Sequence, residues 1–408
     1  MSGRSRQFTD AWIPYGGYWS SPFCAWQGSL STQATIPFAA TIAVRALQER
    51  SIAPGEFDGV CLGTTIPSRQ SFYGAAWFAG LCGLDGVTGP TINQACATSV
   101  RCLANAAEEL ASGAASVYLV AAADRTSNGP QLYYPNPAGP GGAGETENWV
   151  LDSFSRDPFA GSSMLQTAEN VAREAGISRK AQEEITLLRY RQYAEAVADG
   201  GGFHDTFMVR PVELRDRSGR KVVATLRGDE GVFPTTAEGL GRLAPVQDGG
   251  SVTFGTQTHP ADGNAAVIVT RDRARAKTLS RDPNVEVRLV AFGQARVKQG
   301  FMPMAVVPAA RQALERAGIT PADLAGVTTH NPFAVNDAYL ARELQLDPEQ
   351  MNRHGCSLVW GHPQGPTGLR SVIELVEDLV RHGGGFGLFT GCAAGDSAAA
   401  VVLEVLAA

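Results

Sequence analysis

The sequence predicts an α/β protein whose core is built from two copies of one unit and is interrupted by a long insertion. Apolar runs typical of buried strands alternate with segments of helical periodicity in the first and last thirds of the chain. Residues of the first third recur in the last third at one constant offset. The middle third breaks the alternation with Pro, Gly and polar residues.

The first third contains two predicted buried strands and two predicted helices. Residues 59–63 and 116–123 are short apolar runs, which is typical of strands buried on both faces. Residues 37–50 and 70–82 carry apolar positions at helical spacing. Because strands and helices alternate, we expect a mostly parallel sheet covered by helices.

The middle of the chain predicts an insertion rather than continued sheet. Pro and Gly crowd residues 129–144, and residues 209–240 are polar. Helices are expected at residues 161–175 and 181–199. Strand patterns then resume at residues 251–254 and 264–270. The predicted parts are an N-terminal half (1–124 plus 251–272), an insertion (125–250) and a C-terminal half (273–408).

The C-terminal half repeats core and turn residues of the N-terminal half without a gap. At the same offset, Glu56-Phe57 is matched by the similar pair Asp323-Leu324. The identical pairs are Ala46 and Ala313, Leu47 and Leu314, Ile52 and Ile319, Pro54 and Pro321, Gly59 and Gly326, and Val60 and Val327. Two copies of one unit can place equivalent turns opposite each other across a pseudo-twofold axis.

Composition excludes several classes of function. The chain has 408 residues and a net charge of -6, with only 18% charged residues, so we expect no nucleic-acid partner. No segment approaches the roughly 20 consecutive apolar residues that a membrane span needs. The N-terminus lacks the apolar core of a signal peptide, which predicts a cytoplasmic protein. The seven cysteines contain no Cys-x-x-Cys pair, so we predict neither a disulfide framework nor a metal site.

Cys96 is the cysteine with a reactive setting. It follows a predicted strand end at Thr91-Ile92 and precedes a predicted helix that ends near Gly113. The free N–H groups and the dipole at a helix N-terminus favour a thiolate, and nucleophiles are often presented at strand-to-helix turns. The alternative is that Cys96 is a small buried hydrophobe.

His362 lies at the equivalent turn of the second copy. The repeat offset carries position 96 to position 363, and residues 367–381 and 386–390 again read as a helix followed by a strand. We therefore expect Cys96 and His362 to face each other. The imidazole is suited to draw off the thiol proton because its ordinary pKa lies near neutrality.

Four motifs, in order and at family spacing, resemble the thiolase family over nearly the whole chain. Residues 93–99 resemble the nucleophile motif, and residues 361–368 match Gly-His-Pro-x-Gly-x-Ser/Thr-Gly at every defined position. Residues 253–266 fit the Thr-Ala-Gly-Asn…Asp-Gly-Ala-Ala strand, and residues 391–395 occupy the place of a second cysteine and its glycine-rich turn. The resemblance implies a five-layer αβαβα fold and acyl transfer with CoA as substrate, without a permanently bound cofactor.

The resemblance also implies a role for each site residue. Cys96 would carry the acyl group as a thioester, His362 would take the thiol proton, and Cys392 would handle the α-carbon proton of the other acyl-CoA. The backbone N–H groups of Cys96 and Ala394, beside Gly395, would form one oxyanion hole. His362 with a bound water would form the other.

Two positions depart from the usual family pattern. His330 replaces the asparagine that orients the oxyanion-hole water, as in the sterol-carrier-protein-type thiolases, and it can hold that water or donate directly. The alternative is a polar residue at a strand end. Ala394 stands at a usual glycine, which is tolerable where its φ is negative. Thr258 matches the hydroxyl residue near the pantetheine arm, whereas no CoA-contacting basic residue is evident near Asp229-Glu230.

The resemblance favours a thiolase that cleaves a 3-ketoacyl-CoA with CoA or runs the reverse Claisen condensation. A ketoacyl-synthase-like condensing enzyme is the first alternative, but its His-Gly-Thr motif is absent while Cys392 is present. A non-catalytic acyl-CoA-binding scaffold is the second. Thiolases form dimers or dimers of dimers, and some His-type relatives bind a small zinc-ribbon/OB-fold partner.

Aromatic residues suggest a bulky, even aromatic, acyl group. Tyr133 and Tyr134 open the insertion, which shapes the acyl pocket in thiolases, so we expect them to line that pocket. A second aromatic cluster spans residues 12–26. For this cluster, packing in the core is favoured over a subunit contact or a pocket wall.

Overall fold

The computed structural model describes residues 7–216 and 218–407 of the chain. Its helices are α1 (Thr35–Glu49), α2 (Gly74–Leu81), α3 (Thr98–Ser112), α4 (Trp149–Ser155), α5 (Met164–Ala175), α6 (Arg179–Val197), α7 (Ala237–Gly241), α8 (Arg273–Leu279), α9 (Val306–Ala317), α10 (Ala334–Leu344), α11 (Ser357–Trp360) and α12 (Pro366–Arg381). Its strands are β1 (Trp12–Ile13), β2 (Tyr18–Ser20), β3 (Cys24–Ala25), β4 (Gly59–Gly63), β5 (Thr91–Ile92), β6 (Val117–Arg125), β7 (Gln131–Tyr134), β8 (Glu145–Asn148), β9 (Val212–Arg215), β10 (Val222–Leu226), β11 (Ala261–Thr270), β12 (Glu286–Arg296), β13 (Leu324–His330), β14 (Gly385–Ala393) and β15 (Ser397–Leu406).

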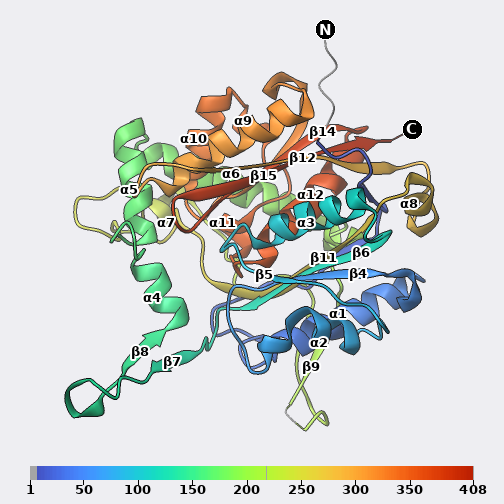
Figure 1. Ribbon diagram of the computed structural model, residues 1–408. Helices are drawn as coiled ribbons and strands as arrows, with labels where there is room; N and C mark the ends of the chain where they lie inside the picture. Colours follow the sequence, from blue (N-terminus) through green and yellow to red (C-terminus); the bar gives the residue numbers. More distant parts are fainter. Residues whose placement is uncertain (1–6, 217, 408) are drawn as a thin grey trace.

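Five layers stack on one another, as the resemblance implies (Figure 1). Helices α9 and α10 cover one outside face, and α1 and α2 cover the opposite one. Between them lie two layers of strands, with α3 and α12 packed in the middle. The short strand β1 pairs with both β11 and β12, so hydrogen bonds join the two layers of strands into one sheet.

The predicted duplication is confirmed by the order of elements. In the first copy α1 leads to β4, and α3 leads to β6. In the second copy α9 leads to β13, and α12 leads to β14. The strands β4 and β6 pair in parallel, and so do β13 and β14. The repeated residues therefore mark the same positions of two equivalent units, and α3 and α12 are partners at the centre.

The expectation of a mostly parallel sheet is wrong, because the sheet is mixed. Strand β11 runs antiparallel to β6, and β15 runs antiparallel to both β14 and β12. The turn at Ala394–Asp396 joins β14 directly to β15, so the chain must run back along its neighbour. The insertion leaves at the end of β6, and the chain returns through β11 in the opposite direction.

The insertion adds helices and two small sheets outside the large one. The expected helices are confirmed as α5 and α6. The hairpin β7–β8 projects from the body, and β9 pairs only with β10 (Figure 1). The strand expected at residues 251–254 is wrong: Thr253 makes one isolated bridge, and the N–H groups of Ser251 and Val252 donate to the Glu169 carboxylate instead.

The central helix α12 is buried along all but its last two residues. Its buried charged side chains are paired: Arg370 with Asp229, Glu377 with Arg281, and Asp378 with Arg353. Pairing is required there because an isolated charge inside a protein is very costly. Neither α12 nor any other helix of the described residues is long and apolar enough to cross a membrane.

Candidate active site

Cys96 lies on a strained turn between β5 and α3. Ala95, directly before it, has φ of 46°, a left-handed conformation that is unfavourable for a residue with a side chain. Two hydrogen bonds hold that residue: its N–H donates to Asn93 Oδ1 at 3.0 Å, and its carbonyl accepts from Thr98 Oγ1 at 2.6 Å. The turn thereby presents the Cys96 sulfur to a cavity shared by both halves of the core.

His362 meets Cys96 from the other copy, as the repeat predicts. Its Nε2 lies 3.2 Å from Cys96 Sγ, and its Nδ1 shares a hydrogen bond of 2.6 Å with Thr367 Oγ1. Thr367 lies at the start of α12, so the buried central helix fixes the orientation of the imidazole. An acceptor nitrogen aimed at a thiol can serve as its base.

Burial decides the protonation states of this pair. It raises the pKa of Cys96 to about 11, although the backbone N–H groups of Ala394 and Cys96 itself pull that pKa down. Burial, and then the neighbouring His330, lower the pKa of His362. The resting pair is therefore a neutral thiol and a neutral imidazole. The thiolate expected from the helix N-terminus is not the resting form, because desolvation outweighs the backbone N–H groups of the turn.

The rate of Cys96 alkylation should report this raised pKa. Since only the thiolate reacts, the rate with iodoacetamide should rise about tenfold per pH unit from pH 7 and level off only near pH 11. Mass spectrometry of the Cys96 peptide measures the rate, and Cys96→Ala gives the background from the other cysteines. A plateau already reached below pH 8 would contradict the neutral pair.

His330 lies against His362, with ring centroids 3.9 Å apart and planes at 25°. Its Nδ1 is 2.9 Å from Ser357 Oγ, whereas its Nε2 is buried without a hydrogen-bond partner among the residues that the structure describes. Burial lowers the pKa of His330 to about 3, so its ring is neutral. The unpaired nitrogen beside His362 is a free donor or acceptor for a bound molecule.

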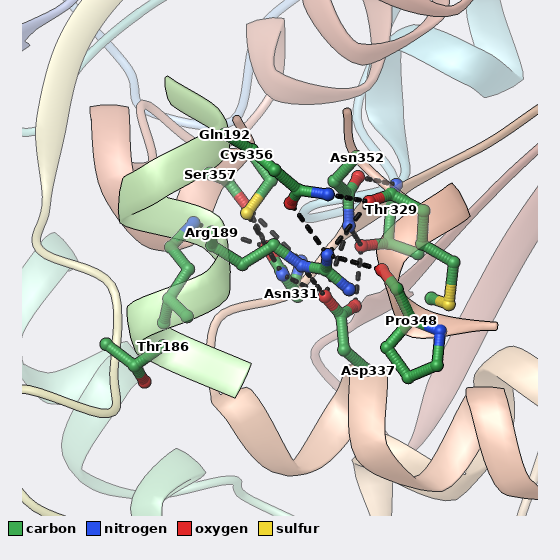
Figure 2. A network of polar contacts seen from close by, with 12 residues as sticks. Thr186, Arg189, Gln192, Thr329, Asn331, Asp337, Pro348, Asn352, Cys356 and Ser357 are labelled. Atoms are coloured by element: carbon green, nitrogen blue, oxygen red, sulfur yellow. Dashed lines mark hydrogen bonds and ion pairs between the residues drawn. The ribbon is translucent and has the colours of Figure 1, made fainter. Parts of the chain in front are cut away.

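A buried polar network includes Ser357 (Figure 2), whose hydroxyl contacts Nδ1 of His330. Asn331 hydrogen-bonds both Ser357 and the Asp337 carboxylate. That carboxylate pairs with Arg189 of α6 at 2.7 Å, and neither side chain is exposed. The network is thus a continuous chain of contacts from the insertion to the histidine, and a packed partner shell of this kind limits side-chain movement.

Three of the remaining predicted residues, Cys392, Ala394 and Thr258, line the same cavity, and Gly395 follows directly after Ala394. Cys392 is buried, which raises its pKa, and it accepts a hydrogen bond of 3.2 Å from Asn336 Nδ2. Ala394 lines the cavity without a positive φ, which meets the condition set by the sequence, whereas Gly395 has φ of 82°. Thr258 also lines the cavity, and its hydroxyl donates to the Ser357 carbonyl at 2.5 Å.

Sequence reasoning missed two residues beside the nucleophile. Gln364 fills the variable position of the Gly-His-Pro-x-Gly motif, and its Oε1 accepts from Cys96 Sγ at 3.3 Å. Asp124 is buried at the end of β6, where its carboxylate accepts from Gly365 N–H and from residues 64–66. A polar residue ending a buried strand is the signal that could have indicated Asp124. The hydrogen bond from the Gly365 N–H to Asp124 also requires glycine at position 365, since a Cβ there would lie 2.7 Å from the carboxylate.

The cavity has a volume of about 460 Å³ and mainly apolar walls. Tyr133 and Tyr134 do not line it, so that expectation is wrong: they lie on the projecting hairpin, 59% and 49% exposed. The aromatic cluster near the N-terminus is core, as favoured, because Tyr18, Trp19 and Phe23 are buried. Apolar lining residues include Ile66, Trp149, Phe154, Met164, Leu165 and Phe333.

Comparison with protein families covers nearly the whole chain. Residues 19–273 match the family described as "Thiolase, N-terminal domain" and residues 284–405 match "Thiolase, C-terminal domain". The chain belongs to the thiolase family. As a thiolase it is an acyltransferase, and this agrees with the paired cysteines and the histidine around one cavity.

Relatives of this thiolase share its length. It is 31% identical to the beta-ketothiolase BktB of Cupriavidus necator, covering 92% of this chain and 95% of that one. It is 30% identical to the 3-ketoacyl-CoA thiolase of Bacillus subtilis, with 93% and 95% covered. Human mitochondrial 3-ketoacyl-CoA thiolase in complex with CoA has a similar structure, with a TM-score of 0.88, 26% identity, and 98% and 99% of the chains covered.

Proposed function

We propose that Cys96, His362 and Cys392 carry out the thiolytic cleavage of a 3-ketoacyl-CoA. Cys96 Sγ attacks the 3-keto carbon, and its proton passes to His362 Nε2 at 3.2 Å. The bond between C2 and C3 then breaks, its electron pair moves to C2, and Cys392 gives its proton to that carbon. Acetyl-CoA leaves, and the shortened acyl group remains on Cys96 as a thioester.

CoA completes the reaction as the second substrate. Its thiol attacks the Cys96 thioester, its proton goes to the Cys392 thiolate, and Cys96 leaves and recovers its proton from His362. The backbone N–H groups of Cys96 and Ala394 lower the pKa of the Cys96 thiol through hydrogen bonding. This supports their role as the oxyanion hole of the acyl group. His362 and the unpaired His330 Nε2 would stabilise the oxygen of the leaving enolate. This scheme uses no permanently bound cofactor, and Thr258 is assigned to the pantetheine arm.

The convergence of Cys96, His362 and Cys392 on one cavity carries this proposal. Its test is CoA-dependent cleavage of a 3-ketoacyl-CoA. Cys392→Ala should still acquire an acyl adduct on Cys96 from an acyl-CoA but should lose α-proton exchange and condensation, whereas His362→Ala should slow adduct formation itself.

Two other outcomes would reject this assignment. Equal rates of adduct formation in wild type and both variants would contradict the division of roles. The pairing of Cys96 with two histidines favours a ketoacyl-synthase-like enzyme as the second candidate. Decarboxylation of a malonyl-type thioester, without CoA-dependent cleavage, would support that candidate.

We infer that the acyl group is bulky and apolar. The support is the cavity wall, to which Trp149 and Phe154 of α4, Ile66 and Phe333 contribute, and not the exposed hairpin tyrosines. The binding of an apolar ligand becomes more favourable in proportion to the apolar surface that the walls remove from water. An aromatic pair adds about 0.5–1.5 kcal/mol.

Removing Phe154 should therefore change substrate choice. Phe154→Ala should lower kcat/KM for a phenyl-substituted 3-ketoacyl-CoA by about tenfold, corresponding to about 1.4 kcal/mol, with little effect on acetoacetyl-CoA. Phe233→Ala, at an exposed aromatic outside the cavity, is the matched control and should change neither value. A preference for acetoacetyl-CoA that Phe154→Ala leaves unchanged would overturn the proposed acyl class.

We further propose a cytoplasmic homodimer or dimer of dimers, built from N-terminal and C-terminal halves and the insertion at 125–250. Exposed apolar side chains at Phe72 and Tyr73, and at the tyrosines of β7, are surfaces that a second copy could cover. We also propose that the chain binds a small zinc-ribbon/OB-fold partner, as some His-type relatives do. Light scattering that gave a single 43.0 kDa chain would reject the homo-oligomer.

A further inference from the structure

Cys96, His330 and His362 form a group with the composition of a metal site. Each offers one ligand atom, and these atoms all lie within 4.8 Å of one another. Two imidazole nitrogens and one thiolate sulfur are the ligands that Zn²⁺ and similar ions prefer. Oxygen-preferring ions such as Mg²⁺ and Ca²⁺ are not suited to this set.

The hydrogen bonds leave one nitrogen of each ring for such an ion. Thr367 Oγ1 holds Nδ1 of His362, and Ser357 Oγ holds Nδ1 of His330. The Nε2 of His362 already points at the Cys96 sulfur. Within residues 7–216 and 218–407, the buried Nε2 of His330 has no hydrogen-bond partner, although buried polar atoms nearly always have one. In metal sites, histidine ligands are oriented in the same way, by a hydrogen bond to the ring nitrogen that does not bind the metal.

We propose that Cys96, His330 and His362 bind a zinc-class divalent ion that reversibly blocks the active site. Binding forms one sulfur–metal and two nitrogen–metal bonds, and the Cys96 thiol proton is released to solvent. Gln364 Oε1, 3.3 Å from the sulfur, or a water can take the fourth position of a tetrahedral set. The three ligand atoms must draw closer than 4.8 Å, so the stacked His330 ring has to tilt toward the sulfur while its Nδ1 keeps the Ser357 contact.

Inhibition follows because one sulfur atom serves both purposes. A metal-bound Cys96 thiolate cannot attack an acyl-CoA, and an acylated Cys96 cannot bind the metal. Metal and acyl group therefore exclude each other. The cysteine spacing predicts no metal site because the three ligands come from separate segments, at the start of α3, the end of β13 and the loop before α12.

Cd²⁺ and Co²⁺ test the proposal directly by spectroscopy on the full-length protein. Cd²⁺ should produce a sulfur-to-metal absorption band in the ultraviolet with one ion per chain, and Co²⁺ should give the visible bands of a tetrahedral site. Cys96→Ala should abolish the sulfur band. His330→Asn should weaken binding at least about tenfold, since even outer partners of metal ligands are worth 10–100-fold in affinity. Cys392→Ala, at a neighbouring cysteine outside the ligand set, should keep the band.

Wild-type protein provides a measurement that does not depend on the folding of variants. Prior alkylation of Cys96 with iodoacetamide should abolish the sulfur band, and Zn²⁺ should slow that alkylation at least about tenfold. A band that survives alkylation, or affinity unchanged by His330→Asn, would overturn the site. Because metal binding is read by absorbance, the result is independent of whether the protein cleaves 3-ketoacyl-CoA.

Discussion

Cys96→Ser should lower the rate of acyl transfer by at least about four orders of magnitude, because a serine hydroxyl at this position offers no accessible anion. His362 is oriented by Thr367 toward one sulfur atom, and the longer thiol fills the 3.2 Å contact. The serine hydroxyl is less acidic than the thiol, so its anion would not form. Its shorter side chain would also leave the oxygen too far from His362 Nε2. The assay is turnover of a 3-ketoacyl-CoA with CoA, together with mass spectrometry of the acyl adduct.

Two comparisons make this result specific to Cys96. Cys102→Ser, at a buried cysteine in α3, should keep the adduct because its side chain lies in the core rather than in the cavity. Intact mass and circular dichroism should show that Cys96→Ser is folded. An acyl label found on Cys24, Cys102 or Cys356 in the wild type would refute the assignment of the nucleophile.

Arg189→Ala should lower the free energy of unfolding by about 3–5 kcal/mol, which is the usual cost of leaving one partner of a buried ion pair alone. Arg189 and Asp337 are both 0% exposed, and Arg189 also donates to the carbonyls of Pro348 and Met351. The substitution therefore leaves the buried Asp337 carboxylate without its counter-ion and removes one donor from each of the two carbonyl groups (Figure 2). Urea denaturation measures the loss.

Arg242→Ala is the matched control for this prediction. Arg242 pairs with Glu238 on α7, also in the insertion, but these side chains are 76% and 75% exposed. An exposed pair of this kind contributes less than about 1 kcal/mol, so its removal should barely move the urea midpoint. Equal losses from both substitutions would show that burial of the Arg189–Asp337 pair does not determine its contribution.

Local sequence determined much of the core. Apolar runs and helical spacing were sufficient for β4, β6, α1 and α12, because a strand or helix buried on most sides needs an apolar side chain at nearly every core position. The repeated residues predicted that two copies exist and that Cys96 and His362 meet. That inference needed no distance, since equivalent turns of two like units can face each other across the axis that relates them.

Tertiary structure decided strand direction, protonation and the outer contacts of the site. The mixed pairing of β11 and β15 depends on where the chain returns, which no local pattern records. Cys96 is a neutral thiol because burial outweighs the helix N-terminus, and burial belongs to the whole fold. Gln364 fills a position that its motif leaves variable, and Asp124 and the Arg189 network have no motif. Tyr133 and Tyr134 looked like pocket residues only because sequence cannot show that their hairpin points away from the body. Periodicity encodes which residues are buried, whereas contacts between segments far apart in the chain exist only once the chain has folded.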